Sequence, residues 1–429
     1  MTGSRPLGMR EISLFFFPLL LNVQMMSVSH SIINAGLARQ NDFVVALAAF
    51  SVAMVLHLFL ASPSYQNHTV TIAMVRGRRS LRGTILFVLL VATWVSIMLS
   101  LVAFTSLGDF ILGSLLGVSG EIAEQAREVL GILVFLPFLT GFRGLFQGLV
   151  MQARHTALVS LATIVRVVAL LGFLALGVRW FGGAVLGAFA LLACIAVETA
   201  LMGIFAWRCR IHHEGGNGER GTLEIIRFAF PLAYSSGLQQ VVPLLINAII
   251  SRLPDGALAL ASFGIIRGFI FLLGGPMRNL QQAYQTLVKN AADYLMLVRF
   301  FRRVGSSLAL LTIVIAYPLS APVLGTLMGL DAETRDYIAL PLAGCALYCY
   351  LYGAVNLLRG WFTSEDRTAE LGRSVIYKNL FLLACWALLT ILPLPAAVPG
   401  VAVAVGLLMS AELCETWYLH HRRERLLAA

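Results

Sequence analysis

Long apolar stretches alternate with short polar connections along the whole chain. An α-helix that crosses the hydrocarbon core of a bilayer needs about 20 predominantly apolar residues. This pattern predicts about twelve membrane-spanning helices, at residues 12–37, 43–62, 84–107, 127–151, 157–178, 183–207, 225–250, 256–275, 304–325, 337–358, 373–394 and 398–419. The fold class is therefore expected to be an all-α polytopic membrane protein.

The composition narrows the class further. Of the 429 residues, 59% are hydrophobic and only 12% are charged, with a mean hydropathy of +0.85. A typical soluble domain is roughly one quarter charged. These values exclude a water-soluble enzyme, a disordered chain and a secreted disulfide-bonded scaffold.

The 31 basic residues outnumber the 21 acidic ones, and most of them lie in every second connection. Basic connections follow the second, fourth, sixth, eighth, tenth and last predicted spans, with Arg76, Arg78, Arg79, Arg82, Arg154, Arg208, Arg210, Arg220, Lys289, Arg299, Arg302, Arg303, Arg367, Arg373, Arg422, Arg423 and Arg425. By the positive-inside rule, we expect an integral plasma (inner) membrane protein with both termini in the cytoplasm.

A polar, glycine-rich connection near the middle of the chain separates two halves. It predicts an N-lobe at 1–211 with spans 1 to 6, a cytoplasmic linker at 212–222, and a C-lobe at 223–429 with spans 7 to 12. The halves also resemble each other, because a shift of 213 positions makes about 19 of 69 residues identical over 11–79. The aligned pairs include Pro18 with Pro231, Asn34 with Asn247, Arg39 with Arg252, Asp42 with Asp255, Pro63 with Pro276, and, after small shifts, Gly148 with Gly360, Arg166 with Lys378 and Glu198 with Glu415.

Six spans in each half is an even number, so both halves are expected to insert the same way round. Transporters built from such repeats bind substrate near the midplane between the halves and alternate access by rocking. The repeat therefore favours a transporter with two six-helix lobes. A channel would more naturally use a ring of identical subunits.

Three arginines, Arg143, Arg166 and Arg267, lie deep within predicted spans, and Lys378 is the repeat counterpart of Arg166. Ionisable side chains in hydrocarbon are costly and mark functional sites. Arginine grips a carboxylate or a phosphate with two parallel N–H bonds. Few acids are expected at the same depth, so these cations predict an anion-binding cavity. The alternative is that the arginines form structural bridges with Glu198 and Glu415.

Polar residues form stripes on two predicted spans. His30 and Asn34 mark the first span, and Gln239, Gln240 and Asn247 mark the seventh, where Pro243 interrupts the backbone hydrogen bonding. We predict that both stripes line the substrate cavity. Interhelical hydrogen bonding is the alternative, and His30 is also a candidate proton site.

Gating or coupling roles are predicted for a second set of residues. Arg39 with Asp42, and Arg252 with Asp255, repeat at the outer ends of spans 1 and 7, where each pair forms either a structural latch or a gate between the lobes. The remaining candidates of this set are Glu198, Glu415 and Pro243.

The sequence contains no phosphate-binding glycine-rich loop with Lys-Ser/Thr, and no nucleophile–base–acid set. Cys345 and Cys349 share a helix face, but no histidine or acid accompanies them at ligand spacing. We therefore expect no catalytic residue, no metal site and no cofactor.

Several segments carry a resemblance to a known family. These segments are Phe17-Pro18 through Asn34-Ala-Gly-Leu-Ala38, Leu47-Ala-Ala-Phe50, Gln240-Val-Val-Pro243 through Ser251-Arg252, Gly360-Trp361, and Gly400 to Glu415. Together they resemble the progressive ankylosis transporter family, which sits beside the multidrug-and-toxin-extrusion (MATE) and lipid-flippase superfamily. The resemblance implies a MATE-like fold of two six-helix lobes, and export of pyrophosphate, nucleotides such as ATP, or citrate-like carboxylates.

The leading hypothesis is a secondary active transporter that exports an anionic metabolite by alternating access. The alternatives are a flippase for a lipid-linked anion and a cation-coupled drug or toxin exporter. The drug-extrusion branch usually has an acid in its first span, and this first span has none. The expected partners are the lipid bilayer, a small anionic substrate and a coupling ion, H⁺ or Na⁺. No nucleic acid partner is expected, and the protein is expected to be a monomer.

Overall fold

The computed structural model describes residues 7–40, 42–116, 118, 120–209, 219–328, 330–392 and 398–428. These residues are helical apart from short connections and contain no strand, which confirms the all-α class. Most of the predicted linker at 212–222 lies outside the described residues.

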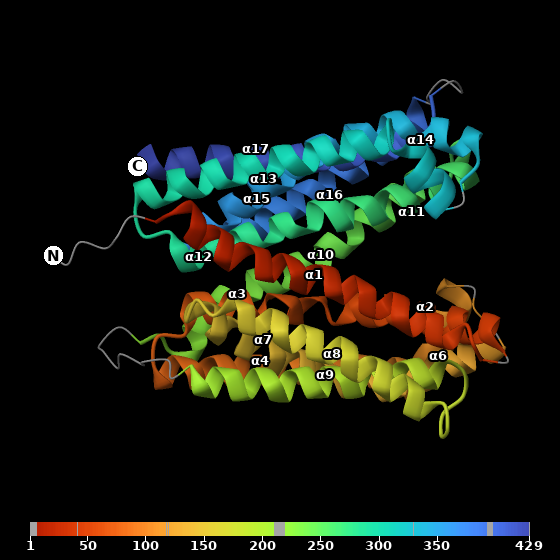
Figure 1. The fold of residues 1–429 in the computed structure, drawn as a ribbon, viewed down its shortest axis with the longest axis horizontal. Coiled ribbons are helices and arrows are strands. Elements are labelled where there is room, and N and C mark those ends of the chain that lie inside the picture. The colour runs from red at the N-terminus through yellow and green to blue at the C-terminus, as the bar shows by residue number, and fades with distance from the viewer. Residues whose placement is uncertain are drawn as a thin grey trace. The chain divides into compact units, whose positions relative to one another are not determined.

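Along the chain, the helices of the second half follow much the same order as those of the first half (Figure 1). The first half contains α1 (Met9–Leu37), α2 (Phe43–Leu60), η1 (Ser62–Gln66), α3 (Asn67–Met74), α4 (Arg78–Phe104), α5 (Ser106–Asp109), η2 (Phe110–Leu115), α6 (Glu121–Leu133), α7 (Leu136–Gln152), α8 (Thr156–Gly177) and α9 (Gly183–Arg208). The second half contains α10 (Thr222–Ile250), α11 (Gly256–Phe269), η3 (Ile270–Gly274), η4 (Gly275–Arg278), α12 (Asn279–Leu287), α13 (Ala291–Ala316), η5 (Ser320–Leu327), α14 (Ala332–Gly344), α15 (Ala346–Ser364), α16 (Thr368–Ile391) and α17 (Gly400–Ala428).

Among the described residues, eight helical stretches are long and apolar enough to cross a membrane, and the count rises to eleven when each of three bent pairs forms one span. The helix α10 is also long, at 29 residues. It is less apolar because its middle carries Ser235, Ser236, Gln239 and Gln240. With α10 included, the helices agree with the twelve predicted spans.

The internal repeat is visible in where the helices break. The second span bends by 58° between α2 and the η1–α3 segment, where Pro63 lies in η1. Its counterpart in the second half changes from α11 through η3 and η4 to α12, with Pro276 in η4. Proline removes a backbone hydrogen bond and disrupts a helix at such positions. A π-helical segment then follows the next long helix in each half, η2 after α4 and η5 after α13.

The chain forms two compact units. The N-unit is Phe17–Gly237, and the C-unit is Met1–Phe16 together with Leu238–Ala429. The first turns of α1 therefore pack with the C-unit, and the first half of α10 packs with the N-unit. The predicted lobe boundaries, 1–211 and 223–429, differ from this division, because they place the whole of α1 in the N-lobe and nearly the whole of α10 in the C-lobe.

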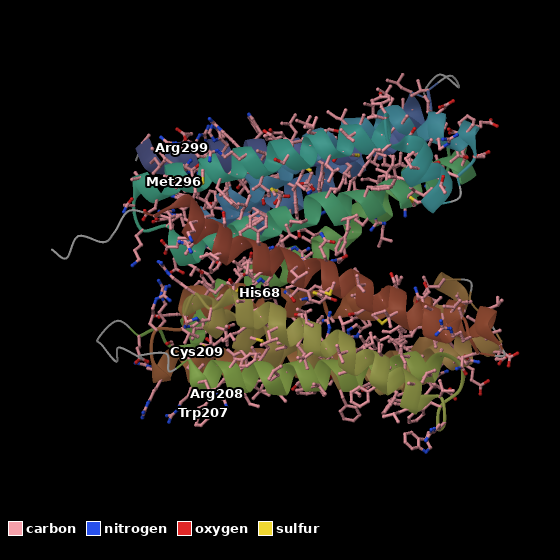
Figure 2. All side chains as sticks on the ribbon, viewed as in Figure 1. His68, Trp207, Arg208, Cys209, Met296 and Arg299 are labelled. Atoms are coloured by element: carbon pink, nitrogen blue, oxygen red, sulfur yellow. The ribbon has the colours of Figure 1, made fainter. Side chains whose placement is uncertain are left out.

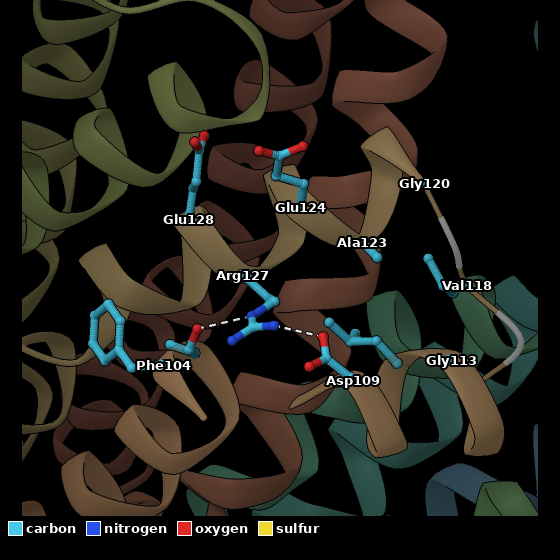
Figure 3. Close-up of a pocket in the computed structure, with 11 residues that line it drawn as sticks. Phe104, Asp109, Gly113, Val118, Gly120, Ala123, Glu124, Arg127 and Glu128 are labelled. Carbon is cyan, nitrogen blue, oxygen red and sulfur yellow. Dashed lines mark hydrogen bonds and ion pairs between the residues drawn. The ribbon is translucent and has the colours of Figure 1, made fainter. Parts of the chain in front are cut away.

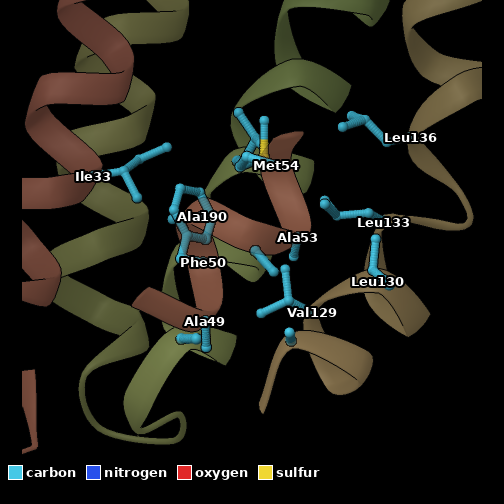
Figure 4. Close-up of a cluster of buried hydrophobic side chains, with 14 of the residues drawn as sticks. Ile33, Ala49, Phe50, Ala53, Met54, Val129, Leu130, Leu133, Leu136 and Ala190 are labelled. Carbon is cyan, nitrogen blue, oxygen red and sulfur yellow. The ribbon is translucent and has the colours of Figure 1, made fainter. Parts of the chain in front are cut away.

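The core of the N-unit is built where α2, α6 and α9 meet (Figure 4). Phe50 and Met54 of α2 pack against Val129 and Leu133 of α6 and against Ala190 of α9. The C-unit has a corresponding core of residues from α10, α11, α14 and α17. These cores fix the helices that carry the buried charged side chains described below.

Gly148 and Gly360, which the repeat aligns, each stand at a close helix crossing within their own unit. A Cβ at Gly148 in α7 would lie 2.6 Å from Thr71 Cβ and 2.9 Å from the His68 carbonyl oxygen of α3. A Cβ at Gly360 in α15 would lie 2.5 Å from Tyr284 Cβ of α12. Both glycines therefore permit a contact that a larger residue would separate.

Gly148→Ala is expected to destabilise the protein by about 1–3 kcal/mol, because overpacking forces α3 and α7 apart. The thermal unfolding midpoint of the purified protein measures this loss. Gly172→Ala in α8 is the matched control, since a Cβ at Gly172 meets nothing within 4 Å. Equal midpoints for the two variants would contradict the crossing.

Candidate functional site

A buried cluster of two arginines and one glutamate lies between α7, α8 and α9 of the N-unit. Glu198 of α9 has no exposed surface. Its Oε2 accepts hydrogen bonds from Arg143 Nη1 at 2.9 Å and from Arg166 Nη1 at 3.2 Å. Both are ion pairs between side chains that are at most one-tenth exposed. Two of the three deep arginines predicted from the sequence thus meet on one carboxylate.

Neighbouring polar groups hold this cluster in place. Thr163 donates to Glu198 at 3.1 Å and also lies 2.6 Å from Asn22 Oδ1 of α1. Arg166 Nη2 donates to Ser29 Oγ at 3.1 Å, also on α1. The cluster therefore ties the first span to α8 and α9.

The expectation that few acids lie at the depth of these arginines was wrong for Arg143 and Arg166. Arg166 is ten residues from the start of α8 at Thr156, and Glu198 is ten residues from the end of α9 at Arg208. At a rise of 1.5 Å per residue, both lie about 15 Å from the same end of the N-unit. The alternative of an ion pair with Glu198 describes this geometry.

The N-unit cluster keeps a surplus positive charge, because two guanidinium groups share one carboxylate. The Nε atoms of Arg143 and Arg166 are buried, and neither has a hydrogen-bond partner among the described residues. Buried N–H groups without partners are costly. The cluster thus combines unused donors with excess positive charge.

The C-unit carries a corresponding cluster between α15, α16 and α17. Glu415 accepts hydrogen bonds from Arg359 Nε at 3.1 Å and from Lys378 Nζ at 3.1 Å. Lys378 also forms an ion pair with Glu412. Lys378 and Glu415 are the repeat counterparts of Arg166 and Glu198, so the same two positions pair in both units.

Two members of the C-unit cluster, Arg359 and Glu412, were not among the predicted site residues. The repeat alignment that pairs Gly360 with Gly148 sets Arg359 opposite Gln147, so the alignment gave no sign of a second arginine. Glu412 precedes Glu415 by three residues, which places both on one face of α17. That spacing was the available signal. With two cations and two carboxylates, this cluster has no surplus charge.

Arg267 differs from the other deep cations. It is exposed, and it takes part in no ion pair or hydrogen bond within the described ranges. It lies eleven residues after the start of α11 at Gly256, or about 16 Å along the helix. A bilayer core is about 30 Å thick, so this guanidinium lies near the middle of its span. Its repeat counterpart is Met54, which is buried in the N-unit core.

The residues of the two polar stripes, on α1 and α10, are only partly buried. Asn34 is exposed, and Gln239, Gln240, Asn247 and His30 are half-buried. Pro243 is also half-buried and lies inside a helix, α10, that continues to Ile250. The predicted cavity-lining role of these residues remains a prediction.

The predicted ion pairs at the outer ends of spans 1 and 7 do not form among the described residues. Arg39 and Asp42 are both exposed and are not joined. Arg252 lies over the ring of Trp386, 4.7 Å from its centroid. Asp255 instead accepts hydrogen bonds from the Tyr337 hydroxyl and from Gly400 N at 2.8 Å. It therefore joins the start of α11, the start of α17 and the helix α14.

Asp255→Asn is expected to loosen this junction and to destabilise the C-unit by about 1–3 kcal/mol, because charge-assisted hydrogen bonds are lost. Partial burial raises the pKa of Asp255, but the bonds from Tyr337 and Gly400 outweigh it and hold the pKa below the ordinary 3.8. The stabilisation is therefore present above pH 3.8 and is lost as the pH falls through the lowered pKa.

Unfolding midpoints of wild type and Asp255→Asn across a pH series measure this contribution. The difference between them should be constant near neutral pH and should shrink only below pH 3.8. A difference that already disappears between pH 7 and pH 5 would contradict the role of the carboxylate.

An open pocket of about 560 Å³ lies between the end of α4, the α5–η2 segment and α6 in the N-unit (Figure 3). Its wall includes Glu124, Glu128 and an ion pair of Arg127 with Asp109 at 2.5 Å. Arg127 Nε also donates to the Ala103 carbonyl at 2.9 Å. Neither Arg143 nor Arg166 lines this pocket, so it is separate from the buried cluster.

Aromatic and basic side chains mark the opposite end of the N-unit. Trp207 and Arg208 project from the end of α9, and Trp207 is 79% exposed (Figure 2). Tryptophan and arginine are favoured where a span leaves the hydrocarbon. This end is therefore suited to a membrane surface.

Comparisons with known proteins agree with this architecture. The model of a family described as "Progressive ankylosis protein (ANKH)" matches residues 9–252. The fold is similar to a MOP superfamily transporter from Pyrococcus furiosus, with 16% identity and a TM-score of 0.73 over 96% of this chain and 95% of that chain. It is also similar to an outward-facing multidrug resistance MATE family transporter, with 16% identity and a TM-score of 0.71 over 98% and 97% of the two chains. Family and fold point to a transporter rather than an enzyme.

Proposed function

Because this chain belongs to the progressive ankylosis protein family, and its fold is that of MATE and MOP superfamily transporters, it is a membrane transporter, and we propose that its cargo is a small anion. Pyrophosphate, a nucleotide or a citrate-like carboxylate is the substrate, and it leaves the cell by secondary active export. The lobes at 1–211 and 223–429 alternate access to the two sides of the plasma membrane, with both termini in the cytoplasm.

This proposal rests on the position of Arg267, which lies near the middle of its span without an ion pair among the described residues. A permanently charged side chain in the middle of a span must face the protein interior or a water-filled path, because hydrocarbon would not solvate it. Arg267 is exposed and is balanced by no carboxylate in the described part of the chain. An anion that enters this path would supply the missing negative charge, with two parallel N–H···O bonds to a phosphate or carboxylate.

The N-unit cluster supports the same sign of cargo. Its surplus positive charge and the unpartnered Nε atoms of Arg143 and Arg166 raise the local positive potential near the middle of the spans. Positive potential attracts anions. In this proposal Arg267 of the C-unit contacts the anion, and Arg143 and Arg166 remain fixed on Glu198 within the N-unit.

A lipid flippase and a drug exporter would each give a different result in vesicles, so one assay separates the three functions. Purified protein in vesicles loaded with radiolabelled pyrophosphate, ATP or citrate should release at least one of them faster than protein-free vesicles. Scrambling of a labelled anionic lipid without release of any soluble anion would favour a flippase. Expulsion of a cationic dye that depends on Glu198 would favour a drug exporter, and either result would contradict the proposal.

A further inference from the structure

The buried cluster of the C-unit contains one carboxylate more than its counterpart in the N-unit. The extra group is Glu412, which takes the place of Ile195 at the offset that relates Glu415 to Glu198. Glu412 is 4% exposed and lies about 18 Å from the start of α17, well within the span. Arg359 and Lys378 could both pair with Glu415 alone, so the ion pairs by themselves do not require Glu412.

The two carboxylates are unequally supported. Glu415 accepts hydrogen bonds from Arg359, from Lys378 Nζ at 3.1 Å and from Ser374 Oγ at 3.4 Å. Among the described residues, Glu412 accepts a hydrogen bond from Lys378 alone, on Oε1. Its Oε2 is buried and has no hydrogen-bond partner in the described residues. The unpartnered oxygen is suited to carry a hydrogen.

Ionisable side chains lie on several of the helices packed near Glu412. The helix α16 contributes Lys378 and Cys385, α15 contributes Arg359, Tyr348 and Tyr352, and α17 itself contributes Cys414 and Glu415. Arg267 of α11 and Arg278 of η4 lie near Tyr348. Tyr337 of α14 lies at the start of α17, away from Glu412. Two carboxylates that share one lysine oppose each other's ionisation. The less supported of the two takes up the proton first.

We propose that Glu412 is the proton-binding group of the transport cycle, while Glu415 stays ionised on Arg359 and Lys378. Uptake adds one proton from water to the Glu412 carboxylate, and release returns it. The formal charge of the four-residue cluster then changes from zero to +1, which is the charge of the N-unit cluster. Only the link to transport rests on the proposed function, and the proton site itself does not.

Infrared difference spectroscopy of the purified protein, between alkaline and acidic buffer, tests the proton site without any substrate. We expect the carbonyl band of a protonated carboxyl in wild type and its loss in Glu412→Gln. Glu370→Gln is the matched control and should keep the band, because Glu370 is a buried carboxylate of α16 that pairs with Arg373 and Arg422. A wild type without the band, or a band that persists in Glu412→Gln, would overturn the proposal.

A second variant covers the case in which Glu412→Gln does not fold. Glu412→Asp keeps a titratable group, so it is expected to shift the frequency and midpoint of the band. A band unchanged in Glu412→Asp would overturn the assignment.

Transport of labelled pyrophosphate tests the coupling in vesicles whose membrane potential is clamped. With one proton per anion, the accumulation ratio of wild type should change about tenfold per unit of pH gradient. Glu412→Gln should lose this dependence on the pH gradient. It should still exchange labelled for unlabelled pyrophosphate when the concentrations inside and outside the vesicles are equal. An equal response of both proteins would overturn the coupling. A wild-type infrared band without any anion flux would instead reject the proposed function and leave the proton site standing.

Discussion

Glu198→Ala is expected to destabilise the N-unit by about 3–5 kcal/mol, the cost of removing one partner from a buried ion pair. The substitution leaves Arg143 and Arg166 in the middle of their spans without a negative charge. It also removes one hydrogen-bond acceptor of Thr163, whose hydroxyl lies 2.6 Å from Asn22 Oδ1 of α1. The folded, monodisperse fraction after purification and the thermal unfolding midpoint measure the effect.

Two comparisons make this expectation specific. Glu128→Ala removes an exposed glutamate from the same unit, and its unfolding midpoint should match that of wild type. The double variant Glu198→Gln with Arg166→Gln removes one charge of each sign and should recover part of the loss. Equal stability of wild type and Glu198→Ala would show that the two arginines do not depend on this carboxylate.

Arg267→Ala is expected to abolish anion transport while leaving the protein folded. A hydrogen bond to a charged group contributes about 1.5–3 kcal/mol, and Arg267 offers two to a phosphate or carboxylate, so the loss in kcat/KM should reach about a hundredfold or more. Stability should change little, because the exposed side chain takes part in no ion pair within the described ranges. Anion efflux and the unfolding midpoint are measured on the same preparation.

Charge and geometry can be separated at this position. Arg267→Lys keeps the positive charge and loses the two-pronged donor, so it should retain partial activity. Arg299→Ala is the matched control, because Arg299 is also exposed and lies near the start of α13 rather than within the middle of a span (Figure 2). Its transport should equal that of wild type.

The fold could be predicted from the sequence because the twelve apolar stretches and the repeat are both strong signals. The repeat also placed Arg166 opposite Lys378 and Glu198 opposite Glu415, and the structure pairs these residues in both units. The pairing of Arg143 and Arg166 with Glu198 stayed an alternative at the level of the sequence, because it depends on how α7, α8 and α9 pack against one another.

The contacts of short polar side chains at helix ends were also beyond sequence reasoning. Asp255 repeats Asp42 and follows Arg252 by three residues, which suggested an ion pair across the loop. The structure instead joins Asp255 to Tyr337 and Gly400, residues that are distant in sequence. Such contacts depend on how α11, α14 and α17 pack, and a residue pattern within one segment does not contain that information.

Efflux of labelled pyrophosphate, ATP and citrate from vesicles that contain wild type or Arg267→Ala tests the account most directly. At least one of these anions should leave wild-type vesicles in a saturable manner, and the same flux should be absent with Arg267→Ala and present with Arg299→Ala. An anion flux that is equal in wild type and Arg267→Ala would contradict the anion-binding role of the midspan arginine.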